Sequence, residues 1–343
     1  MATASNSLPA LPPFEGLDLC ALIHEANTNP PVPMLEGLLN QGEIVGLHGP
    51  AESFKTGFCL QLARSLTTGE YFLGTWKPRQ RYSCLFIETE MSVSSLGQRA
   101  RAIFDKMDGV YFLSEAQLRQ LQRAKNLDGK FALIKQWAGQ CRPDVLILDT
   151  ANPLFRNNES ANEETAVGKF FDELSALPAS LKIFVRHNRK PGQMEFSADD
   201  SLKIRGSGQF SDVPDVLLCM KRTDKRLQQA EMSVTKFRHG FKPAPLTVWF
   251  DGARLRLVPY SPVVYLLKDG PLTRPDLLKA LKDRFNVSQD YADKQLIKPL
   301  RDEDYVLDMA RDGHSKVFSL DTERVKQADW YECFANDTGG GVR

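Results

Sequence analysis

Short apolar runs recur along residues 43–220 and alternate with longer stretches that have helical spacing. Runs that are nearly continuous in Leu, Ile, Val and Phe are typical of parallel strands that helices cover on both faces. We therefore predict an α/β fold with a mostly parallel sheet. The predicted strands are Glu43–His48, Tyr82–Ile87, Val145–Asp149, Leu181–Arg186 and Val216–Met220.

The pattern changes after residue 230 to closely spaced segments in which apolar and polar residues alternate. Asp251-Gly252 separates the last two segments and is a strong turn signal. We predict an antiparallel extension of the same sheet, followed by a domain boundary at Tyr260-Ser261-Pro262. The extension comprises Met232–Phe237, Leu246–Phe250 and Arg254–Val258.

Residues 261–322 carry the pattern of a small second domain. Thr273, with Asp276 three positions on, begins one predicted helix, and Ser288 begins another. Two strand-like segments follow, Tyr305–Met309 and Lys316–Leu320, so that helix, helix and hairpin resemble a winged helix. Residues 261–320 contain ten Lys or Arg and ten Asp or Glu, so the count gives no sign of a basic surface. DNA binding and protein docking are equally open for this domain.

The two ends complete the predicted organisation. Residues 1–33 form a flexible arm with a short amphipathic helix in Phe14–Ala26, and residues 34–260 form the main domain. The winged helix spans 261–322, and 323–343 form a C-terminal tail that ends in a loose Gly-rich stretch.

Composition and charge narrow the class of protein. The chain has 343 residues, of which 42% are hydrophobic and 25% are charged, as in ordinary folded proteins. A net charge of +1 gives no global attraction to nucleic acid or membrane, so any such binding is local. The six cysteines are widely spaced and include no Cys-x-x-Cys pair, which favours neither a zinc site nor a disulfide framework. No basic residue precedes Lys55 and no apolar run approaches the roughly 20 residues that cross a bilayer, so we expect a soluble, cytoplasmic protein without membrane contact.

A candidate phosphate-binding loop follows the first predicted strand and leads into an apolar helical stretch, which is the context that such a loop requires. Backbone N–H groups would cradle the phosphates, Lys55 would reach the β- and γ-phosphates, and the Thr56 hydroxyl would bind Mg²⁺. The predicted nucleotide-binding residues are Gly49, Pro50, Ala51, Glu52, Ser53, Phe54, Lys55, Thr56 and Gly57.

One residue of this loop departs from the usual pattern. Phe54 stands where a second glycine is common, and it places a Cβ and a ring where the backbone favours freedom and close phosphate approach. The alternatives are a degenerate loop that does not hydrolyse nucleotide, or a surface turn that matches by accident. Lys55-Thr56 and the strand-to-helix context favour the functional loop.

Carboxylates follow two of the predicted strands. Asp149 ends an apolar strand and could hold the water shell of the magnesium ion. Glu88 and Glu90 lie at the carboxyl end of another strand, the edge at which open α/β sheets bind ligands. One of them could polarise the attacking water, and we choose Glu90. Glu88 as the base, or both as solvated loop acids, are the alternatives.

These elements, in this order, resemble the RepA-like ATPases, which are relatives of the hexameric DnaB helicases. The resemblance covers about residues 30–258 and implies a RecA-like P-loop NTPase core that uses ATP and Mg²⁺. It implies that Glu90, which precedes Met91, is the catalytic base. It also points to His187 as a sensor of the γ-phosphate, whereas the alternative is a sheet-edge histidine bonded to a neighbouring carbonyl.

The resemblance also extends to cationic residues after the fourth strand. Lys236 and Arg238 match a Lys-x-Arg-x-Gly segment that acts on the nucleotide of the neighbouring subunit in DnaB-like rings. The alternative is a strand whose outward residues happen to be basic. Arg205 is a second candidate of this kind, and the long polar stretch Arg189–Lys203 before it could line a pore or contact phosphates.

The expected function is that of an ATP-hydrolysing, ring-forming motor on DNA. The resemblance implies a homo-oligomer, in the form of a hexameric ring, and a preference for single-stranded DNA. The setting would be replication of a plasmid, phage or mobile element, with a replication or recruitment protein docking on the winged helix. The alternative is an ATP-dependent oligomeric switch without unwinding activity, which the near-neutral charge and Phe54 favour.

Overall fold

The computed structural model describes residues 16–104, 109–155, 163–188, 204, 207–224, 227–254, 256–312 and 315–338. The chain divides into two compact units, Met1–Val32 and Pro33–Arg343. The first unit contains helix α1 (Leu19–Thr28), which begins where the Asp18 carboxylate accepts a hydrogen bond from the Ala21 N–H. No residue of α1 is buried.

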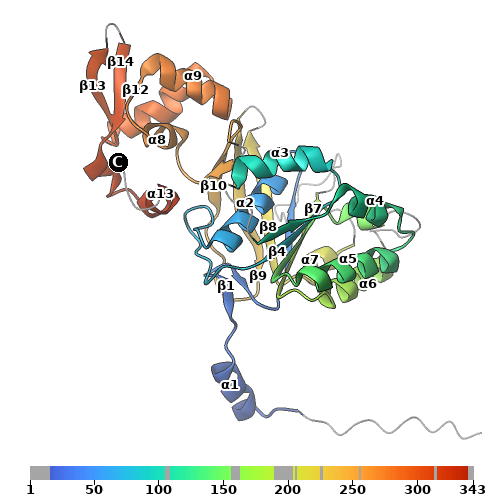
Figure 1. The fold of residues 1–343 in the computed structure, drawn as a ribbon. Helices are drawn as coiled ribbons and strands as arrows, with labels where there is room; N and C mark the ends of the chain where they lie inside the picture. Colours follow the sequence, from blue (N-terminus) through green and yellow to red (C-terminus); the bar gives the residue numbers. More distant parts are fainter. Residues whose placement is uncertain are drawn as a thin grey trace, which may run out of the picture. The chain divides into compact units, whose positions relative to one another are not determined.

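The second unit is built on a large mixed sheet. Within the described residues, nine strands pair in the order β11-β10-β9-β8-β3-β7-β6-β4-β5. The strands from β8 to β5 are parallel, and β9, β10 and β11 are antiparallel (Figure 1). Their bounds are β3 (Ile44–Gly49), β4 (Cys84–Glu88), β5 (Val110–Phe112), β6 (Val145–Asp149), β7 (Leu181–His187), β8 (Val216–Asp224), β9 (Gln229–Phe237), β10 (Leu246–Asp251) and β11 (Arg256–Val258). The predicted α/β fold and its antiparallel extension are confirmed.

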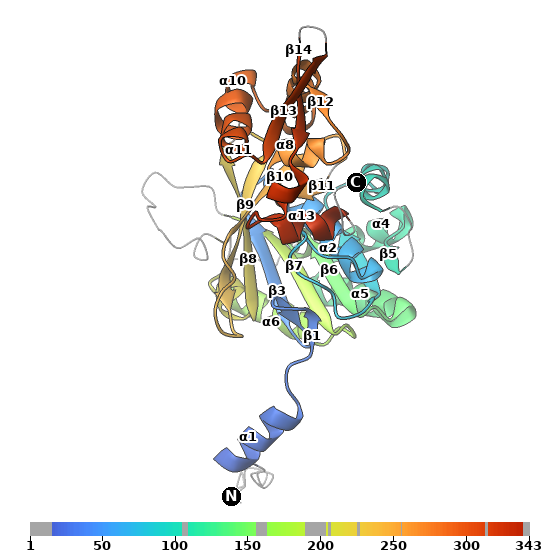
Figure 2. The same cartoon turned by 90° about the vertical axis from the view of Figure 1, so that its left-hand side faces the viewer.

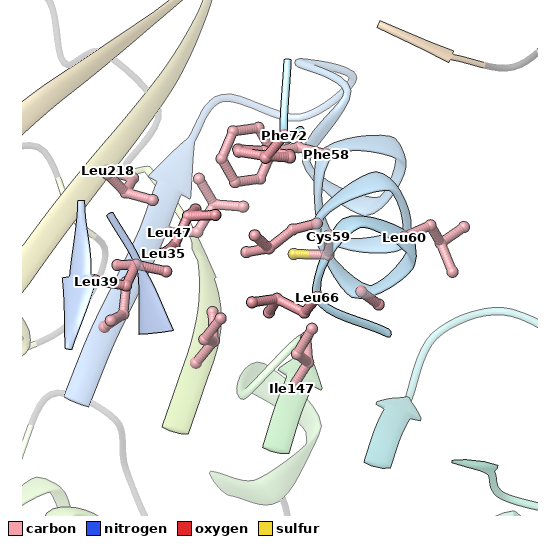
Figure 3. Packing of buried hydrophobic residues seen from close by; sticks show 14 of the residues in the cluster. Leu35, Leu39, Leu47, Phe58, Cys59, Leu60, Leu66, Phe72, Ile147 and Leu218 are labelled. Atoms are coloured by element: carbon pink, nitrogen blue, oxygen red, sulfur yellow. The ribbon is translucent and has the colours of Figure 1, made fainter. Parts of the chain in front are cut away.

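Helices cover both faces of the sheet, which explains why the strands are apolar throughout. Along β6, Val145 and Ile147 belong to one buried cluster, whereas Leu146 and Leu148 belong to the other. Helix α2 (Lys55–Thr68) packs on the first face, where Figure 3 shows Phe58 and Leu66 close to Leu47 and Ile147. Helix α3 (Val93–Ile103) lies on the same face.

The other face carries helices α5 (Leu127–Cys141) and α6 (Glu164–Ser175). Phenylalanine rings dominate here, since Phe170, Phe184 and Phe210 stack edge-on or tilted with centroids 5.8 to 6.0 Å apart. The remaining short elements are β1 (Pro33–Leu35), β2 (Leu39–Asn40), α4 (Glu115–Arg123), η1 (Asn152–Phe155) and α7 (Gln209–Asp212).

The C-terminal elements form a third buried cluster of their own. Helix α9 (Arg274–Phe285) begins at Thr273, whose hydroxyl accepts from the Asp276 N–H, and α10 (Gln289–Tyr291) begins at Ser288 in the same way. Strand β12 pairs with β14, which pairs with β13 (Figure 2). The other elements are α8 (Pro262–Leu267), β12 (Leu272–Thr273), the π-helical turn η3 (Ala292–Ile297), α11 (Lys298–Asp302), β13 (Val306–Asp312), β14 (Ser315–Leu320), α12 (Thr322–Val325) and α13 (Tyr331–Thr338).

Two contacts connect these elements to the large sheet. Asp251, at the end of β10, is fully buried and pairs with the guanidinium of Arg284 on α9. Helix α13, in the stretch expected to be a tail, buries Phe334, and its Asn336 amide donates to the carbonyl of Gly74. Among the described residues, no helix is both long enough and apolar enough to cross a bilayer.

Candidate functional site

A cavity of about 500 Å³ lies at the carboxyl ends of the central parallel strands. The strand register accounts for its composition, because Gly49 at the end of β3 is aligned with His187 on β7, and Glu88 at the end of β4 is aligned with Asp149 on β6. The predicted loop and the predicted carboxylates therefore converge. The sequence-predicted residues that line the cavity are Glu52, Ser53, Phe54, Lys55, Thr56, Gly57, Glu88, Glu90, Asp149 and His187.

The loop backbone is bent sharply around its two ends. Gly49 has a φ of +157°, and a Cβ there would lie 2.1 Å from the carbonyl oxygen of Met220. Only glycine fits at that position. Phe54, in place of the second glycine, adopts φ +65°, which strains a residue that carries a side chain.

The ring of Phe54 forms part of the cavity wall. It stacks on Phe250 of β10 with centroids 4.7 Å apart and an interplanar angle of 11°. The guanidinium of Arg222, on β8, lies 5.3 Å from the centre of the Phe54 ring. The side chain that departs from the usual loop pattern is thus fixed by two strands of the antiparallel extension.

Lys55 is held inside the loop by the loop's own oxygens. Its ammonium donates to the carbonyls of Gly49 (3.1 Å) and Pro50 (2.5 Å) and to the hydroxyl of Ser53 (3.2 Å). Burial lowers the pKa of Lys55 to about 8, against the opposing effect of the nearby Asp149 carboxylate. A phosphate at this position would stabilise the charged ammonium.

Asp149 has the surroundings expected of a magnesium ligand. Its side chain is buried, which raises its pKa, while hydrogen bonding from the Thr56 hydroxyl and the nearby Lys55 charge oppose the rise. The buried Oδ2 atom has no hydrogen-bond partner among the described residues. A carboxylate oxygen without a partner beside a hydroxyl fits the oxygen donors that Mg²⁺ prefers.

Glu88 and Glu90 occupy different environments although they are two residues apart. Glu88 is buried, and its carboxylate accepts from the backbone N–H groups of Glu90 (2.7 Å) and Met91 (2.9 Å). Burial, together with the neighbouring Asp149, raises the pKa of Glu88 to about 8. Glu90 is 39% exposed and faces the cavity.

Two side chains fix the direction of the Glu90 carboxylate. The Thr150 hydroxyl donates to Glu90 Oε1 at 3.0 Å, and His187 Nε2 lies 3.5 Å from Glu90 Oε2. The other ring nitrogen of His187, Nδ1, is buried and has no hydrogen-bond partner among the described residues. His187 thus faces a carboxylate of the site.

The structure does not bring the predicted cationic residues of β9 to this cavity. Val216 at the start of β8 is aligned both with Phe237 and with Val45, so the end of β9 lies at the edge of the sheet opposite the loop. The Lys236 ammonium donates to the carbonyls of Ser211 and Asp212. Arg238 pairs with the Asp215 carboxylate at 2.8 Å. Arg205 and the stretch Arg189–Lys203 lie outside the described residues.

The cavity also contains residues that the sequence did not indicate. Arg99 of α3 lines it, together with Arg222 and Phe250 from the antiparallel strands. Arg99 follows the acidic turn by nine residues, so its position on the next helix was a usable signal. The other two lie more than 160 residues from the loop, and no local pattern connects them to it.

Comparison with known proteins agrees with this layout. A family described as AAA domain matches residues 13–193. The chain belongs to this AAA domain family. The matched part of the AAA domain contains the loop, both glutamates, Asp149 and His187, whereas β8 to β11 and the C-terminal elements lie beyond it.

Two solved structures are similar to this AAA domain protein. One is the KaiC-like protein PH0186 from the hyperthermophilic archaeon Pyrococcus horikoshii OT3, with 14% identity, a TM-score of 0.49, and coverage of 67% of this chain and 96% of that chain. The other is an isolated ATPase domain, with 13% identity, a TM-score of 0.49, and coverage of 71% of this chain and 97% of that chain. No curated protein matches the sequence.

Proposed function

We propose that the chain binds ATP with Mg²⁺ at the cavity and hydrolyses it. The observation that carries this proposal is the convergence of Lys55, Thr56, Asp149 and Glu90 on one cavity. An ammonium and a strand-to-helix loop suit a triphosphate, and the buried Asp149 oxygen suits a divalent cation. The AAA domain match over residues 13–193 supports the same conclusion.

Each residue of the site has a role in this proposal. The ammonium of Lys55 leaves the loop carbonyls and contacts the β- and γ-phosphates, where the loop N–H groups also donate. Thr56 and Asp149 would hold Mg²⁺, which neutralises charge on the phosphates when bound. Glu90 orients a water for in-line attack on the γ-phosphate and accepts its proton. His187 connects the γ-phosphate to the base through its contact with Glu90.

The two glutamates differ in their fitness as base. A carboxyl with a pKa of about 8 is protonated at neutral pH, so Glu88 cannot accept a proton there. Its hydrogen bonds to the turn give it a structural role instead. The more exposed Glu90, held by Thr150, keeps the assignment made from the sequence.

We further propose that the protein is a ring-forming motor that acts on DNA, with a preference for single strands. Lys236 and Arg238 lie at the sheet edge opposite the cavity, so they could reach a nucleotide only on another subunit. The order helix, strand, helix, helix, hairpin in residues 262–320 supports a winged helix. A homohexamer and a recruitment partner for the winged helix complete this proposal.

A second candidate is an ATP-dependent oligomeric switch without unwinding. The observation that favours it is the engagement of Arg238 with Asp215 and of Lys236 with backbone carbonyls of the same chain. These contacts must break before either cation reaches a neighbouring subunit. The two candidates differ in whether DNA stimulates hydrolysis.

The proposal is tested by ATP turnover with and without single-stranded DNA. Lys55→Ala is expected to abolish nucleotide binding, whereas Lys135→Ala, on the exposed side of α5, leaves it unchanged. Glu90→Gln is expected to bind ATP and to lower turnover by at least about a hundredfold, since general base catalysis contributes about 10²–10⁴. Glu88→Gln, which mimics the protonated carboxyl, keeps turnover. Equal loss in both glutamate variants would contradict the assignment of the base.

A further inference from the structure

A second cavity, of about 600 Å³, lies in the C-terminal elements and is rich in cations. It is bordered by the start of α9, by the continuous helix η3–α11, and by β14, and Figure 2 shows α10 and α11 beside the β13–β14 hairpin. We call it the basic groove. Its charged lining residues are Arg274, Asp293, Lys294, Lys298, Arg301 and Lys316.

Helix geometry explains how three of the cations reach the groove. Lys294, Lys298 and Arg301 have the spacing i, i+4, i+7, which places them on one face of the helix η3–α11. Ala292 and Leu296, on another face, are buried in the C-terminal cluster and fix the orientation of the helix. The cationic stripe is therefore about 10 Å long, at a rise of about 1.5 Å per residue.

Folding separates charges that balance in the sequence. Residues 261–320 contain ten basic and ten acidic residues, but five cations and one carboxylate line the groove. The expectation that this domain has no basic stripe is therefore wrong at this face. Acidic residues such as Asp276 and Asp283, on α9, do not line it.

The ion pairs around the groove leave a surplus of positive charge. Arg274 pairs with Asp293 at 2.6 Å, and Asp308 alone serves both Arg301 (2.6 Å) and Lys316 (3.1 Å). Lys294 pairs with the exposed Asp290. Exposed pairs of this kind contribute only about 0–1 kcal/mol, so phosphates can replace the carboxylates at little cost.

We propose that the basic groove binds the phosphate backbone of a nucleic acid. This inference deepens the proposed function, on which it rests for the class of partner. The cores of protein–protein interfaces are depleted in lysine, whereas Lys and Arg from several segments are typical of contacts to phosphate. Cations spaced along a helix and on the facing hairpin match a chain of anions better than a single anion.

The test is binding of a fluorescent oligonucleotide, duplex or single-stranded, to the full chain without nucleotide. Lys294→Ala/Lys298→Ala is compared with a matched control, Lys279→Ala/Lys282→Ala, which removes two exposed lysines of α9 that do not line the groove. Two lost phosphate contacts lower the slope of log affinity against log salt by about 1.8 for a duplex or about 1.4 for a single strand. The control is expected to match the native chain, and thermal melting checks that both variants fold. Lys316→Ala is a second groove variant.

Equal salt slopes for the groove variants and the control would overturn the inference. If a poly-glutamate peptide binds the native chain but not the groove variants, while DNA binding is the same in all, the groove takes an acidic protein segment and the proposal is wrong. Because nucleotide is absent from the assay, a failure of ATP hydrolysis leaves this result unaffected. The two proposals can thus fail separately.

Discussion

The ring of Phe54 in the phosphate-binding loop stacks on the ring of Phe250 in β10, with centroids 4.7 Å apart. The next residue of that strand, Asp251, is fully buried and pairs with Arg284 of α9. Two successive residues of one strand thus contact the loop and the C-terminal elements. The loop side chain that departs most from the usual pattern is part of this connection.

The stack and the strained backbone at Phe54 have opposite effects on stability. Phe54→Gly relieves a positive φ, worth about 1–2 kcal/mol, but removes a stacked pair worth about 0.5–1.5 kcal/mol beyond burial. We expect the substitution to be more favourable by about 0.5–1.5 kcal/mol when Phe250 is already Ala. Urea unfolding of the four chains measures this coupling. A Tyr111→Ala background, on the exposed part of β5, is expected to give no coupling, and additivity with Phe250→Ala would contradict the account.

The buried pair of Asp251 and Arg284 gives a second prediction. Asp251→Asn leaves the guanidinium of Arg284 without its anion and is expected to destabilise the chain by about 3–5 kcal/mol. Asp269→Asn is the control, because Asp269 is 68% exposed and lies 3.9 Å from Arg254. The control is expected to change stability by less than about 0.5 kcal/mol. Similar losses in both variants, measured by chemical unfolding, would refute the importance of the buried pair.

Two glycines predict opposite outcomes for the same substitution. Gly49→Ala places a Cβ 2.1 Å from the Met220 carbonyl oxygen, so the loop must shift and nucleotide binding is expected to be lost. Gly97→Ala, within α3, meets no atom within 4 Å and is expected to stabilise the chain by about 0.5–1 kcal/mol. Thermal melting and nucleotide titration distinguish the two. Normal nucleotide affinity in Gly49→Ala would show that the loop geometry is wrong.

The lowered pKa of Lys55 predicts a pH dependence with a definite sign. Burial favours the neutral amine, and phosphate favours the ammonium, so nucleotide affinity is expected to fall as pH rises above about 8, by up to about tenfold per unit. Between about pH 8 and 10.5 the unfolded chain holds the extra proton, so this group makes the nucleotide-free chain more stable as pH rises. Titrations of a non-hydrolysable ATP analogue at several pH values test this.

Lys55→Arg provides the control for the pH prediction. Arginine stays charged throughout this range, so any residual affinity of that variant is expected to be independent of pH. If the native chain binds the analogue equally well from about pH 7 to about pH 9.5, the ammonium does not contact the phosphates.

Local patterns predicted much of the fold and of the site. The strand Val145–Asp149 is as expected, and Thr273 and Ser288 begin their helices as their types indicate. Alternation between strands and helices placed Lys55, Glu90 and Asp149 at one edge of the sheet, where the structure finds them. These features depend on neighbours in sequence or on the rule that carboxyl ends of parallel strands meet at one edge.

What the sequence could not predict depends on contacts between distant segments. The stack of Phe54 on Phe250 joins residues almost 200 positions apart. The difference between Glu88 and Glu90 arises from burial beside Asp149, which no spacing reveals. The basic groove was hidden because a count of charges is blind to which face each residue occupies. The short strand Val110–Phe112 has too few residues for an apolar pattern.

Isothermal titration calorimetry with ATP and Mg²⁺ tests the central claim most directly. The account predicts saturable binding of one ATP per native chain, loss of that binding in Lys55→Ala, and retention of it in Lys135→Ala and in Glu90→Gln. No heat of binding to the native chain at millimolar ATP, or equal binding to Lys55→Ala, would contradict it.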